Sequence, residues 1–224
     1  MGLLDDLKKQ AENAKGSEVS QTAIMQSNIG ATDSALVLAG KYLATLCSQL
    51  NVIKPVAARV YLLDQVGEIT GLSQAEFFSD YRKADIEGKE RIRQVLLNFR
   101  CTMAKPIQLR RNFDQIDAFR KILSRFGLKH TSQVYKNERG VVTHEVFNIT
   151  GEFLVQTLLE GDHLNGIVKF TMKNFNEFGF TCMHFHAREF NEAVLDEFTK
   201  LIIGKPSNFY KLGKRMPFTG QSSI

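Results

Sequence analysis

The first fifty residues carry apolar positions at helical spacing. Residues 3–15 form an amphipathic pattern, which predicts a short helix, and we expect Gly16-Ser17 to end it. A longer helix is predicted over residues 18–50. Its apolar seam steps by three and four residues, the near-heptad pattern of a coiled coil or a helical hairpin. The main positions of this seam are Val19, Ile29, Leu36, Leu43, Leu46 and Leu50.

The other faces of this long helix are poor in charge. Between Val19 and Ile53 only Asp33 and Lys41 are charged, whereas a long helix in solvent usually carries many charged residues. Either the remainder of the fold covers these faces, or a second copy or a partner does. The pattern leaves both alternatives open.

After Pro55 the apolar period changes to two, which indicates strands. Residues 94–103 show the alternation well, with Val95, Leu97 and Phe99 on one side. The segment 74–84 is ambiguous between strand and helix. Other strands are predicted at 58–63, 68–72, 107–111, 131–137, 141–149, 152–159, 165–173 and 177–186.

Two further helices are predicted among these strands. Residues 113–126 follow Asn112, a good N-cap with Gln115 three residues on, and end at Gly127. The other helix spans 191–202. The order of elements predicts an α+β fold, in which an N-terminal helical region (a short helix plus a long helix) precedes an antiparallel sheet with helices packed on one face.

Composition and charge refine this division. The 224 residues are 43% hydrophobic, as in soluble globular proteins, and include 29 Lys and Arg against 24 Asp and Glu. The last five basic residues follow the last acidic residue, so the body is neutral and the end of the chain carries the net charge of +5. We therefore divide the chain into a helical region (1–54), an α+β domain (55–204) and a basic-aromatic tail (205–224).

The tail has two interpretations. It could order on an acidic partner, a phosphate backbone or an anionic membrane surface. Alternatively, it folds back over the last helix with Phe209 and Phe218 as anchors.

The sequence also bears on location. The longest apolar runs are too short to span a bilayer, and the N-terminus is acidic where a secretory signal would be basic. Three widely spaced cysteines fit a reducing compartment. We predict a cytoplasmic protein without membrane insertion and without a cofactor.

One group of residues suggests metal chemistry. Cys182, His184 and His186 alternate on a predicted strand, so their side chains share one side. Thiolate and imidazole are preferred zinc ligands, but the sequence places no fourth ligand beside them. We predict no metal site and keep these three residues as a weak candidate.

Other chemistry finds little support. Phosphate-binding glycine loops and the nucleophile elbow of hydrolases are absent, so we predict a protein that is not an enzyme. The basic residues of segment 100–129 are interleaved with Phe113, Phe119 and Phe126. Helical spacing places these three rings on one buried face rather than on a stacking surface, so we do not expect nucleic-acid binding.

Four short stretches carry a resemblance. They are LLDDLKKQA at 3–11, LNVIKP at 50–55, FSDYR at 78–82 and IGKPS at 203–207. In these the chain resembles a group of uncharacterised bacterial cytoplasmic proteins with no assigned activity. The resemblance implies a bacterial, cytoplasmic protein and no function beyond that.

The leading hypothesis is a non-enzymatic interaction protein, a scaffold or accessory subunit of a larger bacterial assembly, which contacts a protein partner or a second copy. Its contacts would come from the seam or the uncharged flank of the long helix. The tail would assist through its basic residues Lys211, Lys214 and Arg215. One alternative is a domain that binds a small ligand or a metal on the sheet, and another is nucleic-acid binding through residues 100–129 and the tail.

Overall fold

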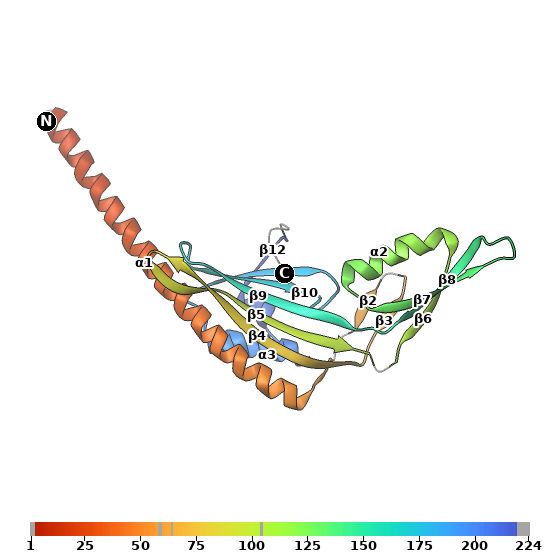
Figure 1. Cartoon of the computed structure of the whole chain (residues 1–224). Coiled ribbons are helices and arrows are strands. Elements are labelled where there is room, and N and C mark those ends of the chain that lie inside the picture. Colours follow the sequence, from red (N-terminus) through yellow and green to blue (C-terminus); the bar gives the residue numbers. More distant parts are fainter. Residues whose placement is uncertain (1–2, 58–59, 64, 104, 219–224) are drawn as a thin grey trace.

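The chain begins with one continuous helix, α1 (Leu3–Ile53) (Figure 1). The computed structural model describes residues 3–57, 60–63, 65–103 and 105–218, with the side chains of α1 from Ser20 onward. The predicted division into a short and a long helix at Gly16-Ser17 is therefore wrong. A glycine inside a helix costs only about 1 kcal/mol relative to alanine, and alanine, lysine and glutamate around it favour the helix.

The described strands form three antiparallel sheets. The largest has seven strands in the order β1-β4-β5-β9-β10-β11-β12, a smaller one has the order β6-β8-β7, and β2 and β3 form a hairpin. The strand bounds are β1 (Val56–Ala57), β2 (Tyr61–Leu63), β3 (Gly67–Ile69), β4 (Leu72–Ile86), β5 (Lys89–Thr102), β6 (Ile107–Asn112), β7 (His130–Lys136), β8 (Val142–Ile149), β9 (Phe153–Asp162), β10 (Ile167–Lys173), β11 (Phe180–His186) and β12 (Lys214–Met216).

The segment 74–84, which the sequence left ambiguous, lies within β4. This strand pairs with β5 along most of its length, but the register shifts between Ala75 and Phe78 and again between Arg82 and Lys83. Each shift exchanges the faces that successive side chains occupy. The period of two is therefore interrupted in the sequence although the strand continues.

One stripe of α1 is buried in the core together with side chains of the seven-stranded sheet. On β5 the buried residues are Val95, Leu97, Phe99 and Cys101, and alternation along the strand turns the residues between them to the opposite face. The side chain of Val19 lies outside the described residues. The other seam residues are 0–6% exposed, and they are Ile29, Leu36, Leu43, Leu46 and Leu50.

Polar contacts fix α1 at two further places. Near its C-terminal end, the Asn51 side chain donates to the carbonyl of Phe77 and accepts from the amide of Phe77, both at 2.8 Å. In the middle, the Tyr42 hydroxyl donates to Asp196 Oδ1 at 2.6 Å, which joins α1 to α3 (Glu192–Ile202). Burial, and then the hydrogen bond to Asp196, raises the pKa of Tyr42.

The smaller sheet carries a 3₁₀ turn, η1 (Phe113–Gln115), and α2 (Ile116–Phe126). Gln115 Oε1 accepts from the amide of Asn112 at 3.3 Å, as the capping pattern predicted. The expectation that Phe113, Phe119 and Phe126 share a buried face is wrong for Phe113, which is 66% exposed. Phe113 precedes the α-helix in the tighter η1 turn, so the helical spacing does not apply to it.

The basic-aromatic tail is part of the fold up to Phe218. Phe209 is fully buried at the start of the short helix α4 (Phe209–Leu212). β12 then pairs with β11 as an edge strand, and Phe218 stacks on Phe180 with ring centroids 4.1 Å apart. Phe209 contacts Phe198 of α3, in agreement with a tail that folds back over the last helix. Phe218 is anchored on β11 and not on that helix.

The predicted α+β class, with a long N-terminal helix and a large antiparallel sheet, is confirmed. Figure 1 shows that α1 and α3 lie together below the seven-stranded sheet, whereas α2 lies at the smaller sheet. The sequence does not predict this separation into a larger and a smaller sheet.

Gly161 of β9 lies where α1 approaches the sheet closely. A Cβ on Gly161 would be 2.7 Å from Leu36 Cδ1 and 2.9 Å from Thr32 Cγ2, whereas a Cβ on Gly40 would meet nothing within 4 Å. Gly161→Ala is expected to lower the free energy of unfolding by about 1–3 kcal/mol. Gly40→Ala should leave it unchanged or raise it by up to about 1 kcal/mol. Chemical denaturation measures both, and equal effects would contradict the close approach.

Arg120 of α2 holds the fully buried carboxylate of Glu145 on β8, with both oxygens within 2.9 Å of Nη2. Arg120→Ala leaves that carboxylate without its guanidinium partner. We expect the free energy of unfolding to fall by about 1–3 kcal/mol. The neighbouring exposed Lys121→Ala is the matched control and should change it by less than about 0.5 kcal/mol.

Candidate functional site

The seam residues of α1 are used within the chain itself. Because Ile29, Leu36, Leu43, Leu46 and Leu50 are buried against the chain's own sheet, a contact with another molecule would need the opposite side of the helix. That side has its own regular spacing, in steps of four and three residues. We call it the α1 flank, and its residues are Ala23, Ser27, Gly30, Ser34, Val37, Lys41, Ala44 and Ser48.

The α1 flank is exposed and almost free of charge. Seven of its residues are exposed, and Val37 is half-buried. Of the two charged residues between Val19 and Ile53, Asp33 forms an ion pair with Arg91 of β5 at 2.9 Å. Lys41 is therefore the one charge on the flank. Small side chains at these spacings allow another helix to approach closely.

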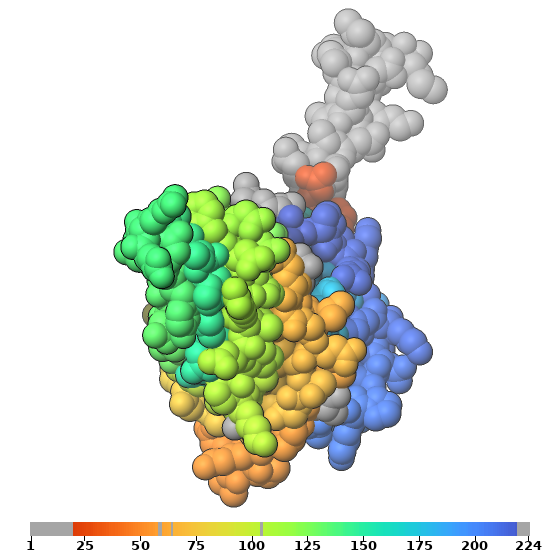
Figure 2. Space-filling model, turned by 90° about the vertical axis from the view of Figure 1, so that its right-hand side faces the viewer, coloured from red at the N-terminus to blue at the C-terminus, as the bar shows by residue number. Residues whose placement is uncertain are grey.

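The N-terminal part of α1 projects beyond the sheet (Figure 1). Near the edge of the body, Asn28 Nδ2 donates to the carbonyl of Leu164 at 3.0 Å, and Arg188 donates to Ser27 Oγ at 3.0 Å. The helix continues from there to Leu3, which at 1.5 Å per residue is about 36 Å. Figure 2 shows the rounded body of the described residues, turned by 90° from the view of Figure 1.

A hollow of about 350 Å³ lies beside the flank, between α1 and β4. Val37, Gly40 and Ala44 line it from the helix, and Tyr81 lines it from the strand. Tyr81 is 51% exposed. The hollow therefore continues the flank with a mostly apolar surface and an accessible aromatic ring.

The segment Ser20–Ile53 is also long and apolar enough to cross a membrane. Its mean hydropathy reaches 1.3 over eighteen residues, and 33% of that window is buried in the fold. The core helix of a soluble protein and a signal sequence give the same signal. The prediction of a cytoplasmic protein without membrane insertion stays a prediction.

The weak metal candidate lies on β11. Cys182, His184 and His186 alternate along this strand, and Cys182 and His184 line a hollow on the face of the seven-stranded sheet that points away from α1. We call this face the outer face. Burial raises the pKa of the Cys182 thiol. In the described part of the chain, no group of three or more His, Cys, Asp or Glu residues is arranged to hold a metal ion.

The surroundings of His184 are cationic. Lys169 of β10 and Lys214 of β12 stand beside it in register. Burial, and then the positive charge of Lys169 and Lys214, holds the pKa of His184 below its ordinary value, although Asp162 opposes the shift. A metal cation at His184 would meet two ammonium groups.

The outer face contains rows of side chains that cross the strands. Register places one residue of each strand from β4 to β12 in a line, and we call the two lines the floor row and the charged row. The floor row is Asp80, Leu96, Leu158, Thr171, Cys182 and Met216. The charged row is Arg82, Gln94, Glu160, Lys169, His184 and Lys214.

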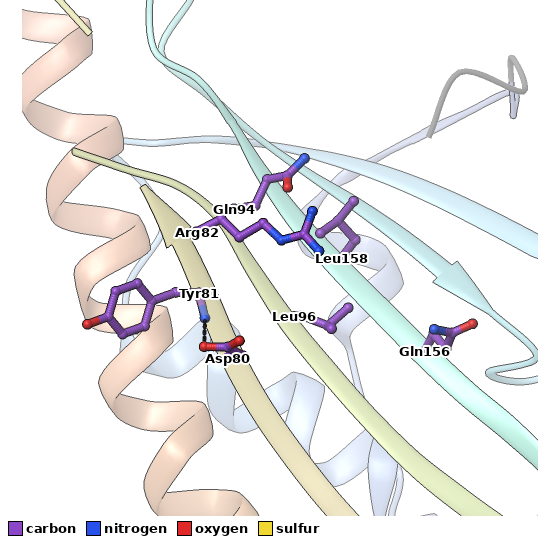
Figure 3. A pocket seen from close by; sticks show the side chains of 7 residues that line it. All are labelled: Asp80, Tyr81, Arg82, Gln94, Leu96, Gln156 and Leu158. Carbon is purple, nitrogen blue, oxygen red and sulfur yellow. Dashed lines mark hydrogen bonds between the residues drawn. The ribbon is translucent and has the colours of Figure 1, made fainter. Parts of the chain in front are cut away.

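Two adjoining hollows lie over these rows. The first has about 220 Å³ and is lined by residues of β4, β5 and β9, which Figure 3 shows around the Arg82 side chain. The second has about 210 Å³ and extends to β12 and Phe218. Both are lined by Leu158. Every lining residue of both hollows comes from the strands or from residues 216–218, so they form one groove on the outer face.

The basic residues of segment 100–129 are largely engaged with acidic residues and rings. Arg100 contacts Glu76 at 2.8 Å and also pairs with Glu152, which Lys129 reaches at 2.7 Å. The side-chain hydrogen bond from Lys129 holds the pKa of Glu152 below its ordinary value despite some desolvation. Such pairing lowers the positive potential that a nucleic-acid surface needs.

A polar cluster lies beneath α1, where the helix leaves the sheet. His163 is 5% exposed, its Nδ1 lies 3.3 Å from the Gly161 carbonyl, and its Nε2 has no hydrogen-bond partner among the described residues. Thr32 Oγ1 of α1 is likewise buried and unpaired. Burial holds the pKa of His163 below its ordinary value, against the opposing effect of the Gly161 carbonyl and Asp33.

Four residues of the groove were singled out from the sequence, each for another reason, and the others were missed. The four are Cys182, His184, Lys214 and Phe218. Arg82, Leu96 and Leu158 were missed, because their neighbourhood depends on strand pairings between distant segments.

Comparisons of the chain with protein-family models, with curated proteins and with solved structures find no match.

Stability is expected to fall as the pH is lowered from about 7 to 5. The unfolded chain takes up a proton on His163 near the ordinary pKa of 6.5, whereas burial keeps the folded residue neutral. Below that pH, protons therefore favour unfolding. Denaturant midpoints measured across this range should decline, and His163→Asn should make the decline less steep. His184 contributes in the same direction, so part of the decline should persist in this variant. An unchanged slope would contradict the assignment.

Proposed function

We propose that the protein is a non-enzymatic interaction protein that associates with a second copy of itself through the α1 flank. In this proposal α1 and α3 together cover the inner face of the seven-stranded sheet, and α1 presents its other side to the second copy. The observation that carries the proposal is the exposure of a regularly spaced, small-residue flank with Lys41 as its one charge. An exposed helix face without charged side chains loses little hydration free energy when a partner covers it.

A second copy can pack on the α1 flank because the residues of the flank are spaced symmetrically about its middle. In an antiparallel pair about an axis between Ser34 and Val37, Lys41 of one copy lies opposite Gly30 of the partner subunit. The two lysines then stand apart, and glycine leaves room for the lysine stem. Isologous twofold pairs are the commonest oligomers, and the hollow beside Tyr81 adds apolar surface next to the helix.

The mass in solution tests this proposal. Light scattering of the whole chain should give about twice the 25.3 kDa of one chain, falling to a single chain in the variant Ser34→Glu with Ala44→Glu. The carboxylates at position 34 of the two copies would then face each other near the axis, and each carboxylate at position 44 would lie opposite Ser27 of the partner subunit. The matched control makes the same two substitutions on exposed α2, Ser124→Glu with Ala118→Glu, and should keep the dimer.

Cross-linking gives a second readout of the same arrangement. The three native cysteines are buried, so Ser34→Cys adds an exposed thiol that should form a disulfide-linked dimer on oxidation, whereas Ser124→Cys should not. If light scattering gives the wild-type protein the mass of one chain, the proposal is overturned. Sedimentation of such a single chain with lipid vesicles would assign the flank to a membrane instead.

A further inference from the structure

The outer face of the seven-stranded sheet has a recessed floor although no residue of a helix lines its hollows. Leu158 and Thr171 are each 7% exposed, and Cys182 is 9% exposed. All three belong to the floor row, in the middle of the sheet. Their low exposure means that the flanking rows and residues 216–218 rise above them as walls.

The chemistry along the groove changes from one side to the other. Leu96, Leu158 and Met216 are the large apolar side chains of the floor row, whereas Asp80 and Thr171 are its polar members. Phe218 closes the far end of the groove by stacking on Phe180. The charged row runs parallel, about 7 Å away, as expected for residues two positions apart on each strand. A ligand lying in the groove would thus have an apolar surface below it and charged groups along one side.

Among the described residues, the side chains of Arg82 and Lys214 in the charged row form no ion pair or hydrogen bond, and of these two Arg82 is the one that lines the hollows. Lys169, by contrast, is held by Asp162 at 2.7 Å. The nearby acids have internal partners: Glu160 accepts from Gln94 at 2.8 Å, and Asp80 accepts from the amide of Tyr81 at 2.8 Å. Figure 3 shows the Arg82 side chain extending toward Leu158, with Gln94 beside it.

We propose that this groove binds an amphiphilic organic anion, with its carboxylate on Arg82 and its hydrocarbon chain along the floor row. A planar guanidinium accepts a carboxylate through two hydrogen bonds, and Gln94 and Gln156 offer amide donors in the same hollow. From β4 to β10 the floor spans three strand spacings, about 14 Å, the length of an extended chain of roughly ten carbons. This proposal is independent of the association through α1.

Decanoate is the probe that tests the proposal. Isothermal titration of the whole chain should show saturable binding of one decanoate, weakened by about tenfold or more in Arg82→Gln. The matched control, Arg93→Gln, removes an exposed arginine of β5 that does not line the groove and should bind as the wild type does. Leu96→Asn should weaken decanoate as well, since it places an amide in the floor.

Two other probes distinguish the contribution of the carboxylate from that of the hydrocarbon chain. Decanol keeps the chain and loses the charge, so it should bind more weakly than decanoate, and inorganic phosphate alone should not bind saturably. Equal binding of decanoate and decyltrimethylammonium, or no loss in Arg82→Gln, would overturn the proposal. Circular dichroism of each variant checks that the fold is retained. Arg82→Gln should not change the mass in solution, so the two proposals can fail separately.

Discussion

At Gly161 the backbone of β9 lies so close to α1 that one added carbon would touch Leu36, Thr32 and His163. This approach allows the apolar stripe of α1 from Ile29 to Leu50 to be buried in the fold. A helix gains most of its stability from packing such a stripe rather than from its own hydrogen bonds. The remaining architecture follows, because the stripe decides which side of the helix is covered and which side stays exposed.

The alternation of successive side chains along each strand separates the two surfaces of the sheet. Val95, Leu97 and Phe99 of β5 are apolar and buried on the side of α1, whereas their neighbours at 94, 96 and 98 point to the outer face. The α1 flank and the outer groove therefore lie on opposite sides of one layer of strands. The two surfaces meet at β4, where Asp80 and Tyr81 line both the groove and the hollow beside the flank. Arg82 and Leu96 line the groove alone, and Val37 and Ala44 line the hollow beside the flank alone.

Much of this fold can be predicted from the sequence, and there are physical reasons why the rest cannot. The seam from Ile29 to Leu50, the capped helix after Asn112 and the meander of the C-terminal half follow from local periodicity. Local periodicity did not show that α1 continues through Gly16. The low helix propensity of a single glycine costs too little free energy to end a helix. Nor did it place Phe113, whose 3₁₀ turn has a different pitch. The groove was least accessible, since Arg82, Leu96 and Leu158 meet only through the register of β4, β5 and β9, and a shift inside β4 disguises it.

The smaller sheet interrupts the larger one in the chain order. β6, α2, β7 and β8 all lie between β5 and β9, and the two sheets are joined through short links at 103–106 and 150–152. Pairing β5 with β9 while the inserted segment is unfolded would require closing a loop of about fifty residues, with the matching loss of chain entropy. When β6 has already paired with β8, the ends of β5 and β9 are one strand spacing apart. The inserted sheet therefore acts during folding as a clamp that brings together the two central strands on which α1 later packs.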